Sequence, residues 1–184
     1  MGDARAVRVL AISGSLRSAS SNSALVDAAA RLAPAGVEVS IFRGLAGIPP
    51  FNPDLDTVAA PAAVLGLRAA LEACDAILIS SPEYAHGAPA VLKNALDWVV
   101  SSGELIEKPI ALINASTRAA HAHASLRETL TTMSGCVIEE ASIMVPLDGR
   151  PLDASGIADD VRLSTLLSSA LDALVRSTRA ARRL

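Results

Sequence analysis

A stretch near the N-terminus brings together residue types that bind a phosphate group. Hydroxyl, amide and guanidinium side chains occur within a few positions, at Ser15, Arg17, Ser20, Ser21 and Asn22. A short apolar run precedes them and an apolar repeat with helical spacing follows, so a helix is expected to begin beside them. The N-terminus of a helix carries about half a positive charge and several unpaired N–H groups, which attract anions. We therefore expect a phosphate monoester to bind here, although Ser20, Ser21 and Asn22 also suit helix capping alone.

Arg17 favours phosphate binding over capping alone, because a cap needs no guanidinium beside it. The dinucleotide pattern GxGxxG is missing from this loop, where only Gly14 stands. The Walker pattern with Gly-Lys-Ser/Thr is missing as well, and Lys93 and Lys108 are the only lysines. The loop therefore suits a single terminal phosphate, as in a mononucleotide such as FMN.

Two further loops carry polar side chains directly after apolar runs. Their residues are Pro82, Glu83, Tyr84, Ala85, His86 and Gly87 in the first, and Ser116 and Thr117 in the second. Tyr84 is either a contact to such a ligand or an ordinary half-buried aromatic residue, and Glu83 is either a ligand or a cap of its own turn. His86 is a candidate proton donor.

A metal site is not expected. His121 and His123 lie two positions apart on an expected helix, so they do not share a face. Cys74 and Cys136 are the only cysteines and show no CxxC spacing, which argues against a zinc site or a disulfide framework.

The three loops need elements that bring them together. Apolar runs that read as strands occur at 7–12, 37–41, 76–80, 110–113 and within 137–145, and helical repeats follow residue 22 and occur at 58–73, 89–100, 120–133 and 157–181. This alternation predicts a doubly wound parallel sheet. Only the second strand alternates as a one-sided edge strand does. We therefore expect a flavodoxin-like three-layer α/β sandwich whose five-stranded parallel sheet has the order 2-1-3-4-5, with the ligand at the carboxyl ends of the strands.

Composition limits the class of protein. The 184 residues suit one domain, spanning 1–184, and the 51% of hydrophobic residues suffice for a core. A net charge of −3 argues against a nucleic-acid-binding protein, because such proteins usually carry a basic surface. No apolar run approaches the roughly 18 residues of a membrane span, so no membrane partner is expected. We expect a cytoplasmic protein.

Two of the loops resemble a known family. The run GSLRSASSN is similar to the GSxRxxSxN loop of the NAD(P)H-dependent FMN reductase family, whose members include quinone, chromate and azo-dye reductases. The run SPEYAHGAPAVLKNALDWVV resembles that family's PEY loop and the LKN-x-x-DW helix after it. The two motifs have the family's order and separation, and the general pattern covers nearly the whole chain.

The resemblance implies a site. The family's phosphate-binding positions correspond to Ser15, Arg17, Ser20 and Asn22, and Ser21 would contribute its backbone. Residues 82–87 correspond to the loop that lies against the isoalloxazine ring of the flavin. Ser116 and Thr117 correspond to the loop that approaches the pyrimidine edge of the flavin. Two positions depart from the family. Many members have Asn where this chain has Ala85, and the third loop often has a Gly-Gly pair where this chain has Arg118-Ala119-Ala120.

The resemblance also implies an activity. FMN would take hydride from NADPH or NADH and pass electrons to a small-molecule acceptor: a quinone, an azo compound, chromate or free flavin. Hydride transfer to a flavin needs no acid from the protein, so we assign no catalytic side chain, His86 included. The family commonly forms a homodimer or homotetramer, and Trp98 is either core or part of such an interface. Two other classes stay open: a flavodoxin-type electron carrier without NAD(P)H activity, and a phosphate-binding regulatory module without redox function. The modest net charge argues against the carrier, which is usually strongly acidic on one face.

Overall fold

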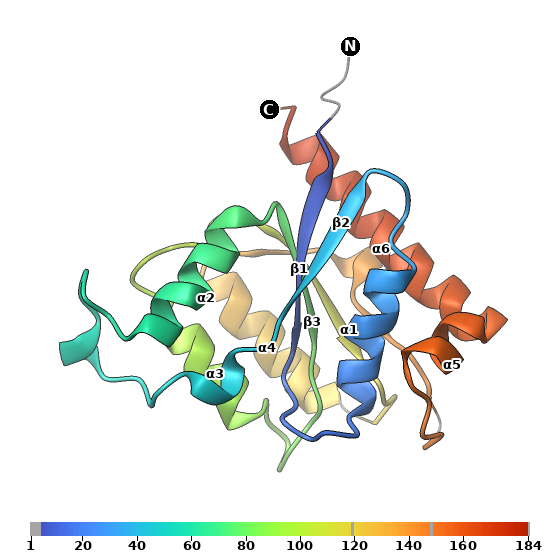
Figure 1. Cartoon of the computed structure of the whole chain (residues 1–184), viewed down its shortest axis with the longest axis horizontal. Helices are drawn as coiled ribbons and strands as arrows, with labels where there is room; N and C mark the ends of the chain where they lie inside the picture. The colour runs from blue at the N-terminus through green and yellow to red at the C-terminus, as the bar shows by residue number, and fades with distance from the viewer. Residues whose placement is uncertain (1–4, 119, 148, 184) are drawn as a thin grey trace.

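A parallel sheet with helices on both faces forms the molecule (Figure 1). The computed structural model describes residues 5–118, 120–147 and 149–183. The strands are β1 (Val7–Ser13), β2 (Val37–Phe42), β3 (Ala76–Ser80), β4 (Pro109–Asn114), β5 (Cys136–Val137) and β6 (Ile143–Met144). They follow the order β2-β1-β3-β4-β5, and β6 also pairs with β4. All pairs are parallel, as predicted. The predicted strand order 2-1-3-4-5 is also confirmed.

The helices divide between the two faces of the sheet. They are α1 (Ser21–Arg31), α2 (Ala62–Ala73), α3 (Ala90–Asp97), α4 (Ala120–Thr132), α5 (Ala154–Asp159) and α6 (Val161–Ala181). Figure 1 shows α1, α5 and α6 on one side of the strands and α2, α3 and α4 on the other. Successive residues of β1 point to opposite faces: Val9 and Ala11 join the core under α1 and α6, whereas Leu10 and Ile12 join the core under α2, α3 and α4.

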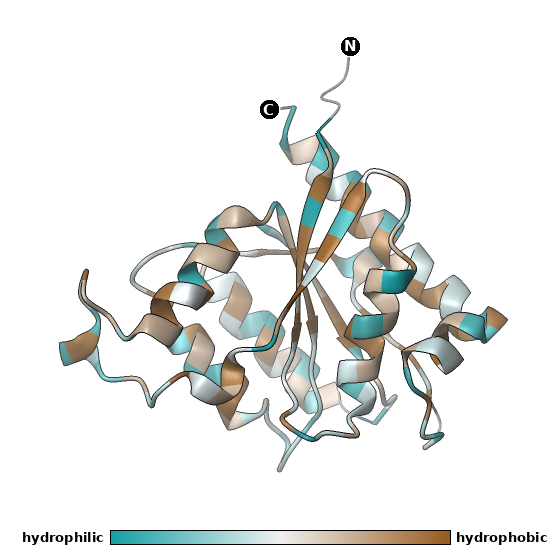
Figure 2. Ribbon diagram, in the orientation of Figure 1, coloured by the Kyte–Doolittle hydropathy of each residue, from teal (hydrophilic) through white to brown (hydrophobic). Residues whose placement is uncertain are grey.

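The central strands are apolar because both of their faces are covered. Every residue of β3 and β4 is buried, whereas β2 at the edge alternates between buried and exposed positions near its start. Figure 2 shows the central strands mostly in the hydrophobic colour. The apolar runs and the one alternating run therefore have the burial that their sequences predict.

The predicted fifth strand is interrupted. It consists of β5 and β6 with a short 3-10 helix, η3 (Glu139–Ala141), between them. Ser142 explains how the sheet tolerates the break: its Oγ accepts a hydrogen bond from the Leu112 backbone N–H at 3.1 Å and donates one to the Ile138 carbonyl at 2.8 Å. A side-chain hydroxyl thus satisfies the β4 donor that a continuous strand would have paired.

Two helix boundaries also differ from the prediction. The expected helix over 157–181 is two helices, because Asp160 accepts hydrogen bonds from the N–H groups of Arg162 and Leu163 at 3.0 and 3.1 Å and begins α6. The expected helix over 58–73 begins only at Ala62, after Pro61. Proline disfavours a helical conformation in the residue before it, so the helix does not extend to Val58.

Trp98 belongs to the core. It is fully buried, and its indole N–H donates to the Pro49 carbonyl at 2.8 Å. The Phe51 ring meets the indole edge-on at a centroid distance of 5.1 Å. The residue thus holds the loop that follows β2 against α3 and offers no surface for a second subunit. Within the described residues, no helix is long and apolar enough to cross a bilayer.

Asp75 joins both ends of the chain to the middle of the sheet. Its carboxylate accepts a hydrogen bond from the Arg8 backbone N–H at 2.8 Å and pairs with Arg5 at 2.9 Å and Arg182 at 2.7 Å. Burial raises the pKa of this carboxyl, but the hydrogen bonds from Arg8 and the charges of Arg182 and Arg5 outweigh it, so the net pKa is lowered.

Asp75→Asn is expected to lower the free energy of unfolding by about 1.5–3 kcal/mol at pH 7, because it removes a charged hydrogen-bond acceptor. The pKa of Asp75 is lower in the folded than in the unfolded protein, so its contribution to the free energy of unfolding is present above the unfolded pKa of about 4 and is lost as pH falls through the folded value.

Urea unfolding at pH 7 and pH 3 checks this expectation. The difference in free energy of unfolding between wild type and the Asp75 variant should be smaller at pH 3. The exposed Asp54, substituted by Asn, is the control and should change stability by less than about 0.5 kcal/mol. Equal loss in both variants would contradict the expectation.

Candidate functional site

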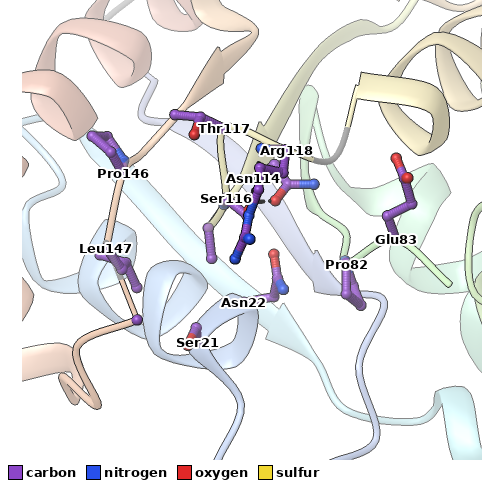
Figure 3. A pocket seen from close by; sticks show the side chains of 12 residues that line it. Ser21, Asn22, Pro82, Glu83, Asn114, Ser116, Thr117, Arg118, Pro146 and Leu147 are labelled. Carbon is purple, nitrogen blue, oxygen red and sulfur yellow. Dashed lines mark hydrogen bonds between the residues drawn. The ribbon is translucent and has the colours of Figure 1, made fainter. Parts of the chain in front are cut away.

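A pocket of about 650 Å³ lies at the carboxyl edge of the sheet (Figure 3). Three loops leave this edge after β1, β3 and β4 and are called loop 1 (14–20), loop 2 (81–89) and loop 3 (115–118). Loops 2 and 3 line the pocket together with the first turn of α1 and residues after β6, whereas loop 1 lies outside its wall. The pocket is lined by Ser21, Asn22, Pro82, Glu83, Asn114, Ala115, Ser116, Thr117, Arg118, Pro146, Leu147 and Gly149. Its size is that of small-molecule and cofactor sites.

The expected site residues divide into two groups. The pocket wall contains Ser21, Asn22, Pro82, Glu83, Ser116 and Thr117. The others, Ser15, Arg17, Ser20, Tyr84, Ala85, His86 and Gly87, lie in loops 1 and 2 outside that wall. Ser20 and Ser21 also line a neighbouring cleft of about 520 Å³ beside the first turn of α1. Ala119 lies outside the described residues.

Loop 1 is organised by serine side chains. Ser20 is the N-cap of α1, and its Oγ accepts a hydrogen bond from the Ser23 N–H at 3.2 Å. The Ser15 Oγ accepts one from the Arg17 N–H at 3.3 Å. The Ser13 hydroxyl accepts from the Ser15 N–H at 3.3 Å and lies 3.0 Å from the Ser23 hydroxyl. Ser13 lies just beyond the expected strand over 7–12, and sequence reasoning did not single it out as a residue that holds loop 1 to the start of α1.

Asn22 is buried at the edge of the pocket. Its side chain Oδ1 accepts a hydrogen bond from the Ser80 hydroxyl at 2.8 Å, and only 7% of Asn22 is exposed. Ser80 is the last residue of β3, so this bond joins the start of α1 to the neighbouring strand. The amide Nδ2 is then the part of Asn22 that a ligand can engage.

Loop 2 contains a tight turn with two strained residues. Tyr84 and Gly87 exchange two backbone hydrogen bonds, at 3.0 and 2.9 Å, across Ala85 and His86. Both corner residues have positive φ, +49° at Ala85 and +62° at His86. This is the conformation of a type I′ turn, which favours Asn and Gly. The turn leaves the Tyr84 side chain exposed.

Glu83 caps a neighbouring helix and not its own turn. Its Oε2 accepts a hydrogen bond from the Ala122 backbone N–H at 2.9 Å, in the first turn of α4. The His86 ring lies 4.2 Å from the His121 ring, between centroids, which is a second contact between loop 2 and α4. The partner of Glu83 lies far along the chain, so local sequence gave no signal for it. Among the described residues, no cluster of three or more His, Cys, Asp or Glu side chains can hold a metal.

Loop 3 is fixed by Asn114. Its Nδ2 donates to the Ser81 carbonyl at 2.5 Å, and its Oδ1 accepts from the Ser116 N–H at 2.8 Å. The Ser116 Oγ in turn accepts from the Arg118 N–H at 3.2 Å. Asn114 is 2% exposed, so these bonds are shielded from water. A polar residue that ends a fully apolar strand is the signal by which sequence reasoning would have found it.

The groups around the pocket suit FMN. Hydroxyl, amide, guanidinium and backbone N–H groups supply donors for a phosphate and for the carbonyl and ring nitrogen acceptors of a flavin. Glu83 is the one carboxylate among the described lining residues, and its bond to α4 makes it less available to repel an anion.

Ala85→Asn is expected to raise the free energy of unfolding by about 0.5–1 kcal/mol, since Asn tolerates positive φ better than Ala does. Denaturant unfolding of the protein without ligand measures this. Ala85→Val is the matched control and should lower stability, because a β-branched residue is strained there. If both substitutions shift stability in the same direction, the strain at Ala85 does not decide the outcome.

Comparison with known proteins agrees with this geometry. The model of the family described as NADPH-dependent FMN reductase matches residues 7–149. An NAD(P)H-dependent FMN reductase of Pseudomonas aeruginosa is 35% identical over 173 residues, covering 91% of this chain and 93% of the relative. A 2-hydroxy-1,4-benzoquinone reductase of a Burkholderia species is 31% identical over 165 residues, covering 85% and 89%. The solved structure of FerB, a flavoenzyme NAD(P)H:(acceptor) oxidoreductase from Paracoccus denitrificans, matches with a TM-score of 0.76 at 28% identity, covering 95% of this chain and 98% of FerB. The chain belongs to the NADPH-dependent FMN reductase family.

Proposed function

We propose that this flavin-dependent NAD(P)H oxidoreductase binds FMN at the carboxyl edge of the sheet and passes electrons to a quinone. The observation that carries the proposal is the pocket of about 650 Å³ at this edge, where hydrogen-bond donors of the first turn of α1 and of loop 3 face one space. Bound FMN supplies the hydride-accepting and electron-donating chemistry. The residues of the chain bind it, orient it and adjust its charge.

The first turn of α1 and loop 1 would hold the phosphate. Ser15, Ser20 and Asn22 offer side-chain donors, Ser21 offers its backbone N–H at the helix start, and Arg17 offers a guanidinium. The Arg17 side chain is exposed and forms no ion pair with any residue that the structure describes. Its charge is therefore available to a phosphate, which accepts two parallel hydrogen bonds from a guanidinium.

Loops 2 and 3 would hold the ring system. In this proposal the residues of loop 2 that lie along the ring are Pro82, Glu83, Tyr84, Ala85, His86 and Gly87. Ser116 and Thr117 lie at its pyrimidine edge, where backbone N–H groups stabilise negative charge. Glu83 and Asn114 act as positioning residues, because their side chains hold these loops and not the ligand.

The names of the relatives favour a quinone as the acceptor. The Burkholderia relative is named a benzoquinone reductase, and an Escherichia coli relative of 29% identity is named a quinone reductase. An azo compound, chromate and free flavin are the alternative acceptors. A homodimer or homotetramer remains part of the proposal, supported by the exposed apolar side chains of Val100 and Ile106 between α3 and α4.

Arg17→Ala is expected to weaken FMN binding about 10- to 100-fold, because it removes a charged contact of about 1.5–3 kcal/mol. Titration followed by flavin fluorescence measures the dissociation constant, and circular dichroism should show an unchanged fold. Arg162→Ala removes an exposed arginine from α6 and should leave the affinity as it is. An unaltered affinity in the Arg17 variant would rule out its role at the phosphate.

Anaerobic addition of NADPH or NADH to the FMN complex is expected to bleach the flavin absorbance, and a benzoquinone added afterwards should restore it. The electrons leave the nicotinamide as hydride and reach the quinone with two protons as the hydroquinone. Stopped-flow absorbance measures both steps and identifies the faster donor. Flavin that binds but is not bleached would replace this proposal by the electron carrier, and protein that binds no flavin would leave the regulatory module.

A further inference from the structure

The Arg118 side chain lines the pocket, and it has no acidic partner among the residues that the structure describes. Figure 3 shows the side chain extending from loop 3 into the space near Asn22. The bond from its backbone N–H to the Ser116 Oγ, 3.2 Å long, fixes the base of the side chain. Across residues 5–118, 120–147 and 149–183, no carboxylate forms an ion pair with it. A positive charge therefore faces the ligand site, and no carboxylate of the described residues pairs with it.

The rest of the pocket wall reinforces this charge. The α1 helix begins at Ser21, so its N-terminus presents a partial positive charge to the same space. Glu83 is the acidic residue among the described lining residues, and its Oε2 is bonded to the Ala122 N–H. A ligand in this pocket is stabilised in proportion to the negative charge that it carries.

We infer that Arg118 tunes the redox balance of bound FMN by stabilising its reduced form. The inference rests on the proposed FMN site. Hydride brings two electrons and one proton to the ring, so the ring gains one negative charge. A guanidinium beside the ligand then stabilises reduced FMN more than oxidised FMN. The consequence is a flavin that NAD(P)H reduces more readily and that transfers electrons to the acceptor with a smaller driving force.

The conformation of loop 3 does not depend on the Arg118 side chain. Arg118 adds a cation to a loop whose start is already fixed by Asn114 and Ser116. Its substitution should therefore remove charge without releasing the loop, because the bond to Ser116 uses the backbone and not the side chain.

The test compares Arg118→Gln, which removes the charge, with Arg118→Lys, which keeps it. Dissociation constants are measured for oxidised FMN and for chemically reduced FMN, and the two-electron midpoint potential of bound FMN is measured anaerobically against a reference dye. We expect Arg118→Gln to lose about tenfold in its preference for reduced over oxidised FMN, which corresponds to a midpoint potential about 30 mV lower. Arg118→Lys should keep most of the preference. Arg162→Gln, a charge removal at an exposed position of α6, should leave the potential unchanged.

Each other outcome overturns the inference. Equal weakening of both flavin forms would make Arg118 a simple binding contact. An unchanged potential with a selective loss of NADPH over NADH turnover would place its role at the 2′-phosphate of the nucleotide. Wild-type protein that binds no FMN would overturn the proposed function itself, and this result is visible before any variant is made.

Discussion

The amide of Asn114 ties together the ends of β3 and β4. One side of the amide donates to the Ser81 carbonyl and the other accepts from the Ser116 N–H, so loops 2 and 3 leave the sheet in a fixed relation. The residue is 2% exposed, and a buried amide that lost one of these partners would leave a polar group unsatisfied. The pocket wall depends on this bond, because the lining residues of both loops are positioned by it.

The parallel sheet makes such a short connection possible. In the order β2-β1-β3-β4, the carboxyl ends of β1, β3 and β4 are adjacent, and polar side chains link the segments that follow or end these strands. Asn22 meets Ser80 across the first boundary, and Asn114 meets the loop after Ser80 across the second. Glu83 adds the link from loop 2 to α4. Side-chain hydrogen bonds thus connect segments that are far apart in sequence along this edge of the sheet.

Sequence reasoning reached the parts of this arrangement that depend on local pattern. The all-apolar runs of β3 and β4 and the alternation in β2 predicted which strands are covered on both faces, and hence the strand order. It failed where a side chain replaces a backbone partner. The Ser142 hydroxyl accepts the hydrogen bond from the Leu112 N–H that a neighbouring strand would otherwise accept. The Asp160 side chain caps the start of α6, although the apolar repeat continues across this position. The bond from Glu83 to Ala122 was equally invisible, because its partner is defined by the fold and not by spacing.

The choice between structural and ligand-binding roles for the loop 1 side chains is not exclusive. Ser15 and Ser20 each use an oxygen lone pair to accept a backbone N–H, and Asn22 uses its Oδ1 to accept the Ser80 hydroxyl. A hydroxyl that accepts one bond still has its own proton to donate, and an amide still has its Nδ2. The acceptors of these side chains are thus satisfied within the protein, while their donor groups form no hydrogen bond that would prevent them from meeting an anion. The bonds that stabilise loop 1 and the start of α1 are therefore compatible with the proposed phosphate site.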